Sequence, residues 1–240
     1  SPSVATFRRS LSGRCLLDVR RRGKWLVFPL DDGCSALAHL RMTGNLHLRE
    51  PDAPRLSHVR LCLELDDGRE LCFRDPRKFG RWRLVRDPGE VLDALGPEPL
   101  DPAWRGSHLA AALRSRRRAL KPLLLDQSFV AGLGNIYTDE ALWHARLHPL
   151  RLSASLTDEE VRRLYRSIRR VLRRAIDFEG TPLGSGRMHY EPTEGRAGLH
   201  QHVLRVYGRT GQPCGRCGSA IERLVVGQRG THVCPLCQQP

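Results

Sequence analysis

Four cysteines near the end of the printed sequence constrain the fold more than any other feature. They are spaced Cys-x2-Cys-x16-Cys-x2-Cys, at Cys214, Cys217, Cys234 and Cys237. Two Cys-x2-Cys pairs at this separation are typical of a tetrahedral zinc site rather than of a disulfide framework. A segment of this size does not fold without its metal, so the sequence predicts one structural zinc ion, Zn2+.

The residues between the two cysteine pairs have the pattern of a β-hairpin. Residues 221–226 and 231–233 fit its two strands, and residues 228–230, Gln-Arg-Gly, would form its tip. We expect a short strand over residues 203–207 to lead into this segment. A zinc-bound hairpin with Arg229 at its tip suits a groove of DNA.

The other four of the eight cysteines are scattered, and we expect them to be buried, reduced thiols: Cys15, Cys34, Cys62 and Cys72. Together with the predicted zinc site, this usage indicates a cytosolic protein. Lysine and arginine number 40 against 26 acidic residues, and the net charge of +14 favours a polyanionic partner. No apolar run is long enough to span a membrane, and no signal peptide is visible.

The first part of the chain has the pattern of antiparallel β-structure. Residues 24–30 form a buried-strand run, and the pattern continues over residues 36–48. A hairpin over residues 59–73 follows, with its turn at Asp67-Gly68. Several short antiparallel strands predict a sandwich or a barrel.

A domain boundary and a helical region follow. Residues 96–102 contain three prolines, which exclude both a helix and a central strand. Beyond them, Ser107 can cap a helix through Leu113. Residues 157–160, Thr-Asp-Glu-Glu, form a capping box before an apolar stripe at helical spacing over residues 161–176.

Between these helices lies a corner with two glycines, Gly132 and Gly134, followed by Asn135. Both glycines can adopt positive φ and leave their N–H groups bare where a helix begins. Such a place suits a phosphate, and the Asn135 amide adds a donor. The alternative is an ordinary helix–turn–helix corner in which the glycines serve only the bend.

The chain resembles the formamidopyrimidine-DNA glycosylases, a bacterial base-excision family. The resemblance rests on six motifs, which occur here in the same order as in the family. They lie between residues 21 and 238: Arg21-Arg22-Gly23-Lys24; His39-Leu40-Arg41-Met42-Thr43-Gly44; Asp75-Pro76-Arg77-Lys78-Phe79-Gly80; Leu95-Gly96-Pro97-Glu98-Pro99-Leu100; the corner at 132–137; and Val206-Tyr207-Gly208-Arg209 with the four cysteines.

The resemblance implies an α+β protein with three domains. An antiparallel β-sandwich would span residues 1–95, a helix-two-turn-helix domain residues 104–190 and a zinc β-hairpin residues 203–240. The partner would be damaged double-stranded DNA, lying in a basic cleft between the β-domain and the helices. The protein would act as a monomer without a membrane, in the bacterial cytoplasm at the nucleoid.

The implied activity is excision of oxidised purines, namely 8-oxoguanine and formamidopyrimidines. The family then nicks the strand by β,δ-elimination, through a Schiff base on an N-terminal proline, with no metal in the reaction. Three alternatives stay open. They are a catalytically inert paralogue that binds damaged DNA, an endonuclease VIII-like glycosylase for oxidised pyrimidines, and a zinc-ribbon RNA-binding protein.

The resemblance also implies roles for single residues. Met42, Arg77 and Phe79 match the residues that fill the void left by the expelled nucleotide, although alone Met42 and Phe79 would more often be core residues. Asn135 and Arg229 match the two clamps on the phosphates that flank the lesion.

Four further residues match the family less specifically. Lys24 matches a lysine near the flipped nucleotide and is our candidate for the chemistry on its sugar, although without the family it would be a surface lysine. Lys121 and His58 resemble further phosphate contacts. Glu140 is expected to hold structure together rather than to act as an acid.

Two segments depart from the family. The loop over residues 180–198 begins Gly-Thr-Pro, where Pro182 removes an N–H, and Leu199 stands where many relatives have an aromatic residue. The start Ser1-Pro2-Ser3 differs from the family's Pro-Glu-Leu-Pro-Glu, and Ser1 acylates the Pro2 nitrogen. We therefore expect an N-terminally truncated glycosylase that binds damaged DNA but barely cleaves it.

Overall fold

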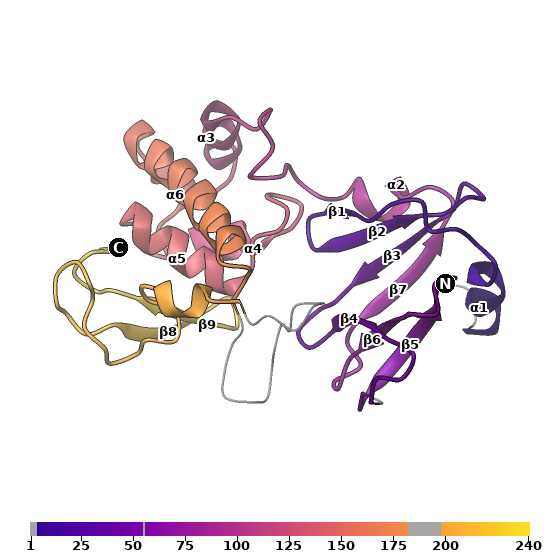
Figure 1. Ribbon diagram of the computed structural model, residues 1–240. Coiled ribbons are helices and arrows are strands. Elements are labelled where there is room, and N and C mark those ends of the chain that lie inside the picture. The colour runs from indigo at the N-terminus through magenta and orange to yellow at the C-terminus, as the bar shows by residue number, and fades with distance from the viewer. Residues whose placement is uncertain (1–3, 55, 182–197) are drawn as a thin grey trace. The chain divides into compact units, whose positions relative to one another are not determined.

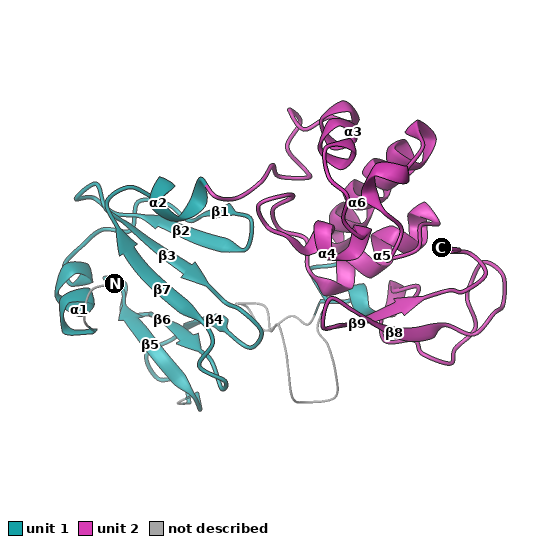
Figure 2. Ribbon diagram, turned by 180° about the vertical axis from the view of Figure 1, so that it is seen from behind, with its two compact units in different colours: residues 1–93, 178–201 teal, residues 94–177, 202–240 magenta. Residues whose placement is uncertain are grey.

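A computed structural model describes residues 4–54, 56–181 and 198–240 of the chain. The chain divides into two compact units, which are described separately (Figures 1 and 2). Unit 1 comprises residues 1–93 and 178–201, and unit 2 comprises residues 94–177 and 202–240. The predicted helical region and the zinc hairpin thus lie together in unit 2, and the division at residues 93–94 falls just before the proline-rich segment.

Unit 1 contains two antiparallel sheets, of strand order β1-β2-β3-β7 and β4-β6-β5. Its strands and helices are α1 (Val4–Leu11), β1 (Arg20–Arg22), β2 (Trp25–Pro29), β3 (Ser35–His39), β4 (Asn45–Arg49), β5 (Val59–Glu64), β6 (Glu70–Arg74), β7 (Arg81–Val85) and α2 (Gly89–Leu92). Phe28 stacks on Trp82 within the first sheet, and Phe73 from the second sheet meets Trp82 edge-on at 5.9 Å between ring centroids. The predicted sandwich is confirmed.

The chain crosses between the two sheets twice, and the two crossovers begin and end beside each other. Residues 40–44 join β3 to β4, and residues 75–80 join β6 to β7. His39 pairs with Arg81 in one sheet, and Asn45 pairs with Arg74 in the other. These pairings bring the two connecting loops together at one end of the sandwich.

Two features of unit 1 differ from the sequence expectations. The run 36–48 is two strands in different sheets, because residues 40–44 turn between them. The helix α1, which the sequence analysis did not anticipate, precedes β1.

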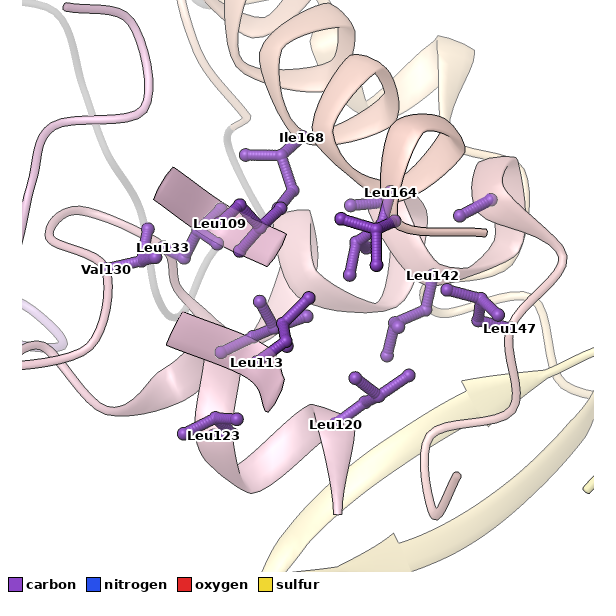
Figure 3. Packing of buried hydrophobic residues seen from close by; sticks show 14 of the residues in the cluster. Leu109, Leu113, Leu120, Leu123, Val130, Leu133, Leu142, Leu147, Leu164 and Ile168 are labelled. Carbon is purple, nitrogen blue, oxygen red and sulfur yellow. The ribbon is translucent and has the colours of Figure 1, made fainter. Parts of the chain in front are cut away.

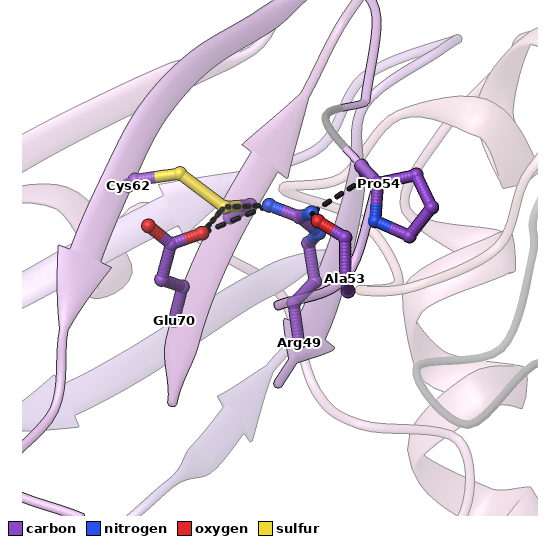
Figure 4. The surroundings of a disulfide bond; sticks show 6 residues. Arg49, Ala53, Pro54, Cys62 and Glu70 are labelled. Carbon is purple, nitrogen blue, oxygen red and sulfur yellow. Dashed lines mark hydrogen bonds and ion pairs between the residues drawn. A yellow bond between two sulfur atoms is a disulfide. The ribbon is translucent and has the colours of Figure 1, made fainter. Parts of the chain in front are cut away.

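The structure corrects the prediction of four reduced, buried thiols. Cys62 and Cys72 lie opposite each other on β5 and β6 and form a disulfide (Figure 4). Cys15 is exposed and Cys34 is half-buried. The pairing depends on the register of two strands, which the spacing of the cysteines along the chain does not reveal.

The charged group beside this disulfide is tightly held. The Arg49 guanidinium donates to a Glu70 carboxylate oxygen at 2.8 Å and to the carbonyl oxygens of Ala53 and Pro54 (Figure 4). It therefore fixes the segment that follows β4 against the β6 strand.

Unit 2 is built on a core of leucines drawn from four helices (Figure 3). Its elements are α3 (Gly106–Arg114), α4 (Leu120–Leu125), α5 (Asn135–Ala145), the 3-10 turn η1 (Ser153–Ser155), α6 (Asp158–Asp177), β8 (Glu222–Val226) and β9 (Arg229–Val233), while the 3-10 turn η2 (His200–Val203) spans the boundary between the units. Leu109, Leu113, Leu142, Leu164 and Ile168 are essentially inaccessible to solvent. The apolar stripe of α6 is core from Val161 to Leu172, as predicted, whereas Ile176 at the end of the stripe is exposed.

The helix caps were predicted with mixed success. The Thr157 hydroxyl accepts from the Glu160 N–H at 3.2 Å and the Glu160 carboxylate accepts from the Thr157 N–H at 2.8 Å, which confirms the capping box. The prediction that Ser107 caps α3 is wrong, because the helix begins at Gly106 with Arg105 as its N-cap.

Among the described residues, every helix is too short or too polar to span a membrane.

Candidate nucleic-acid interface

The structure contains the predicted glycine corner before α5, but its two glycines adopt different backbone conformations. Gly132 has φ of 90°, whereas Gly134 is extended and is the N-cap of α5. The Gly132 N–H is occupied, since it donates to the Gln127 side-chain oxygen at 2.9 Å. The other backbone donors near the corner belong to the start of α5, because the first N–H groups of a helix have no partner within the helix itself. A helix N-terminus of this kind favours an anion.

Asn135 and Arg229, the predicted phosphate clamps, come together at the β8–β9 hairpin. The Asn135 amide donates to the carbonyl oxygen of Gly230 at 3.0 Å. Arg229 precedes Gly230, begins β9 and is exposed. The predicted hairpin is confirmed, but its predicted tip at residues 228–230 is wrong, because Val226 pairs with Arg229 and the turn is formed by Gly227 and Gln228. One carbonyl thus ties the start of α5 to the end of the hairpin.

Lys121 has another role than the predicted phosphate contact. Its side chain is fully buried, and its ammonium donates to Asp139 at 2.6 Å and to the Gly230 carbonyl at 3.0 Å. Burial lowers the pKa of Lys121, and the Asp139 carboxylate opposes that shift. The second Asp139 oxygen accepts from the His232 N–H at 2.9 Å. Because the ammonium has no surface exposed, Lys121 positions the hairpin from beneath.

Glu140 anchors the segment that enters the zinc hairpin. Its carboxylate accepts the backbone N–H groups of Arg205, Val206 and Tyr207 at distances of 2.8 to 3.0 Å. These bonds confirm its structural role. They also explain why the strand predicted over residues 203–207 is wrong, because the N–H groups face a side chain rather than a neighbouring strand.

The four cysteines of the predicted zinc site converge. Their sulfur atoms all lie within 4.8 Å of one another, with 3.4 Å between Cys217 and Cys234 and 4.0 Å between Cys214 and Cys237. Tetrahedral zinc with bonds of about 2.3 Å to sulfur needs sulfur atoms at about this separation, so the donors fit. The Trp143 indole N–H donates to the Cys214 sulfur at 3.4 Å and orients that ligand from α5.

In unit 1 the two crossovers carry the residues predicted to fill the void in the duplex, Met42, Arg77 and Phe79. We call these three the wedge residues, and they form one exposed cluster. The side chains of Met42 and Phe79 are 51% and 46% exposed, which is unusual for residues of this size and apolarity. The Arg77 guanidinium lies 4.5 Å from the Phe79 ring centroid and 3.7 Å from the Met42 sulfur. The structure thus joins three residues from two loops in one patch.

Asp75, for which the sequence predicted no role, supports this cluster from beneath. Asp75 is buried, accepts from the Thr43 hydroxyl of the other crossover, and accepts the Gly80 N–H at 2.7 Å. Burial alone would raise the pKa of Asp75, but the hydrogen bonds from Thr43 and from backbone N–H groups outweigh it and lower the pKa. Its place at the end of a predicted strand, directly before a proline, was the available signal.

Gly44 and Gly80, in the two crossovers, cannot be replaced by a larger residue, because there is no room for a Cβ atom at either position. A Cβ on Gly44 would lie 2.7 Å from the Phe73 ring, and one on Gly80 would lie 2.2 Å from it. The backbones of the two crossovers therefore pack directly on the sandwich core, and this packing fixes the positions of Met42 and Phe79.

Lys24 is exposed in the β1–β2 turn, and its charge acts on His39 at the end of β3. Burial, then the charges of Arg41 and Lys24, lowers the pKa of His39 to about 4. The neutral His39 ring accepts the Arg41 N–H at 3.1 Å. Lys24 thus lies near the start of the first crossover. His58 is exposed beside Ser57, 3.0 Å between its ring nitrogen and the hydroxyl.

The departures noted in the loop after α6 fall mostly outside the described residues, Pro182 among them. Leu199 is described and is 56% exposed. Thr181 and His200, which flank the undescribed stretch, are buried and bound to each other at 2.9 Å.

Comparison with known proteins accounts for nearly the whole chain. Three family models match: the formamidopyrimidine-DNA glycosylase N-terminal domain at residues 1–82, the H2TH domain of the same enzymes at residues 95–185, and the zinc finger found in FPG and IleRS at residues 211–240. A formamidopyrimidine-DNA glycosylase of Roseiflexus is 49% identical over 241 residues, which is 100% of this chain and 87% of the relative.

Two solved structures are similar throughout. One is the Lactococcus lactis Fpg (MutM) in complex with Fapy-dG-containing DNA, at 37% identity and a TM-score of 0.88. The other is MutM in complex with DNA that contains carbocyclic 8-oxo-G, also at 37% identity and 0.88. Each comparison covers 98% of this chain and 86% of the other.

Proposed function

The chain belongs to the formamidopyrimidine-DNA glycosylase family, and we propose that it serves base-excision repair of oxidised purines as a DNA glycosylase and abasic-site lyase. The exposed cluster of Met42, Arg77 and Phe79 carries this proposal. Large apolar side chains held in solvent on a rigid base match the task of entering a base stack from which one nucleotide has been expelled.

Each wedge residue contributes differently. Met42 and Phe79 replace the stacking that the duplex loses, and the Arg77 guanidinium can donate to the orphaned partner base. Asp75 acts beneath them as a positioning residue, because its bonds to Thr43 and Gly80 keep the two crossovers in register.

The phosphates that flank the lesion would be held by unit 2. The first turn of α5 offers backbone N–H groups, Asn135 offers its amide and Arg229 offers a guanidinium that can bind two phosphate oxygens. The carbonyl of Gly230 and the buried Lys121–Asp139 pair keep these donors together. The zinc ion is structural, since it holds the hairpin that carries Arg229.

Lys24 is the candidate for direct work on the nucleotide. It lies at the same end of the sandwich as the first crossover, where the charge of Arg41 is also felt by His39. Residues 1–240 contain no Pro-Glu-Leu-Pro-Glu segment, so the secondary amine on which the family forms its Schiff base has no counterpart among them.

The decisive experiment compares residues 1–240 with the same residues preceded by the family's Pro-Glu-Leu-Pro-Glu segment and helix. Both proteins should bind a duplex with 8-oxoguanine, and only the extended one should excise it and be trapped covalently by borohydride at its proline. Preferred excision of thymine glycol would favour the endonuclease VIII-like alternative. Binding without excision by the extended protein would favour an inert paralogue.

The phosphate contacts have a separate test in the salt dependence of binding. If about six phosphates are contacted, duplex affinity should fall roughly a thousandfold between 50 and 200 mM salt. Arg229→Ala should weaken binding to all duplexes and lower the salt slope by about one, while Asn135→Ala should weaken binding with little change in slope. A loss confined to one base sequence would contradict the assignment.

A further inference from the structure

A second basic site lies in unit 2, at the far end of α5 from the glycine corner. A cavity of about 250 Å3 is lined by His144 of α5 and by four residues of α6, Arg163, Arg166, Ser167 and Arg170. Positions three, four and seven residues apart share one face of a helix, so the regular spacing of α6 directs these side chains to one place.

Part of this basic cluster has a structural explanation. The last carbonyls of α5 need donors, and Arg163 donates to the Ala145 carbonyl at 3.2 Å. Arg216 donates to the Trp143 carbonyl at 3.1 Å and covers the Trp143 ring at 4.1 Å. Arg163 also lies 3.6 Å from Glu159. These two arginines therefore complete the end of α5.

The same explanation does not extend to Arg166 and Arg170. Among the described residues, no carboxylate forms an ion pair with either guanidinium, and the only side-chain hydrogen bond of Arg166 reaches the Arg162 carbonyl within the helix. Both side chains are exposed at the cavity, beside the largely buried Ser167. Two unneutralised cations one helical turn apart repel each other, and a bound anion would remove that repulsion.

The remaining lining group is compatible with an anion. Burial, then the charges of nearby arginines, first Arg170 and Arg216, lowers the pKa of His144 to about 4. The cavity as described thus contains arginines, a hydroxyl and a neutral imidazole, and its lining includes no acidic residue.

We propose that this cavity binds a phosphate group, with the guanidinium groups of Arg166 and Arg170 and the Ser167 hydroxyl as its donors. Planar guanidinium groups match phosphate oxygens in pairs. The site differs from the corner at Asn135, because nine residues of helix separate Asn135 from His144, a rise of about 13 Å. The phosphate can belong to the backbone of a nucleic acid or to a small phosphate-bearing molecule.

The first arm of the test uses inorganic phosphate and the zinc-loaded protein. Arg166→Gln/Arg170→Gln should weaken phosphate binding about tenfold or more, measured by calorimetry and by the arginine Nε–Hε signals in NMR. The matched control is Arg162→Gln/Arg173→Gln, which removes the same charge from exposed positions of α6 outside the cavity and should leave phosphate affinity within about twofold. Arg166→Lys/Arg170→Lys keeps the charge and should bind phosphate with intermediate affinity.

The second arm distinguishes the source of the phosphate. If the site takes DNA backbone, Arg166→Gln/Arg170→Gln should lower the salt slope of duplex binding by about two, and the control pair should not. If it takes a small phosphate-bearing molecule, the duplex slope should stay unchanged while phosphate binding is lost. Equal phosphate affinity in the wild-type protein and the Arg166→Gln/Arg170→Gln variant, or equal loss in the two double variants, would overturn the proposal.

Discussion

The corner of unit 2 and the crossovers of unit 1 support the proposed DNA-contacting side chains in opposite ways. At the corner, the supporting groups are charged and buried: Lys121 and Asp139 have no exposed side-chain surface and hold the hairpin through Gly230. At the crossovers, two of the three presented side chains, Met42 and Phe79, are apolar and exposed, and the loops that carry them are held by one buried carboxylate, Asp75.

The difference follows from what each region is proposed to hold. A phosphate clamp must keep donors in place without filling the site, so its rigidity comes from ion pairs and hydrogen bonds underneath. A wedge must expose apolar surface that water disfavours, so its backbone is fixed by close packing of Gly44 and Gly80 on Phe73. The two regions should therefore fail in different ways when their supports are removed.

Loss of zinc should have the largest effect and should be confined to unit 2. Cys214 and Cys234 form the small core of the finger with Trp143, Val206 and Ile221, so chelation removes both metal and packing. Structural zinc is worth about 10 kcal/mol or more, and we expect residues 206–238 to unfold and duplex affinity to fall at least about a hundredfold. Hydrogen exchange should show the strands of unit 1 still protected.

Added zinc should restore both exchange protection and affinity. Full duplex affinity in the metal-free protein would show that the hairpin is not needed for binding.

Removal of the buried cation should have the next largest effect. Lys121→Met leaves the Asp139 charge buried and unpaired, and we expect unit 2 to lose about 3 to 5 kcal/mol of unfolding free energy. The matched control is Arg118→Met, which breaks the exposed Arg118–Asp126 pair and should cost less than about 1 kcal/mol. Urea unfolding measures both.

The same variant tests the reassignment of Lys121. Because the buried ammonium touches no phosphate in our account, Lys121→Met should leave the salt slope of duplex binding unchanged in conditions where the protein is folded. A slope lowered by about one would restore Lys121 as a phosphate contact.

Asp75, which supports the wedge residues, should contribute less to the free energy of unfolding than the buried Lys121–Asp139 ion pair. Asp75→Asn keeps the size of the side chain but turns one carboxylate oxygen into an amide that cannot accept, and we expect a loss of about 1 to 3 kcal/mol. Affinity for damaged duplex should fall more than affinity for intact duplex, because the crossovers lose their register. Asp66→Asn, at an exposed position of the β5–β6 turn, is the control and should change neither quantity.

The smallest effect concerns the pH dependence of unit 1. The pKa of His39 is about 4 in the folded protein and about 6.5 when unfolded, so between these values the unfolded chain binds more protons. The contribution of His39 to the free energy of unfolding should therefore be fully present above pH 6.5, and it should be lost as the pH falls from 6.5 to 4. The nearby cations Arg41, Lys24 and Arg81 all act in this direction.

Replacement of His39 isolates this contribution. His39→Gln, whose amide oxygen can still accept the Arg41 N–H, should show a smaller loss of stability between pH 7 and pH 5 in urea unfolding. A ring of His39 that titrates near pH 6.5 in NMR would contradict the prediction.

The sequence by itself determined features that depend on neighbours in the chain. Hydrophobic alternation located the hairpin over residues 59–73, the spacing of Thr157 and Glu160 located the start of α6, and the cysteine spacing located the zinc site. It also supplied the proposed DNA contacts Met42, Arg77, Phe79, Asn135 and Arg229, because the family's motifs are contiguous segments. Each of these signals is local, and local periodicity and capping are set by bonds between residues a few positions apart.

Only the tertiary structure decided which distant residues meet. The register of β5 and β6 joined Cys62 to Cys72, and the crossovers placed Asp75 under Thr43 and Gly80. Lys121 became a buried support because Asp139 and Gly230 lie where its ammonium points, 18 and 109 residues away along the chain. Burial and pairing of a charge depend on such long-range neighbours, so the same lysine reads as a surface contact in sequence and as a core ion pair in the fold.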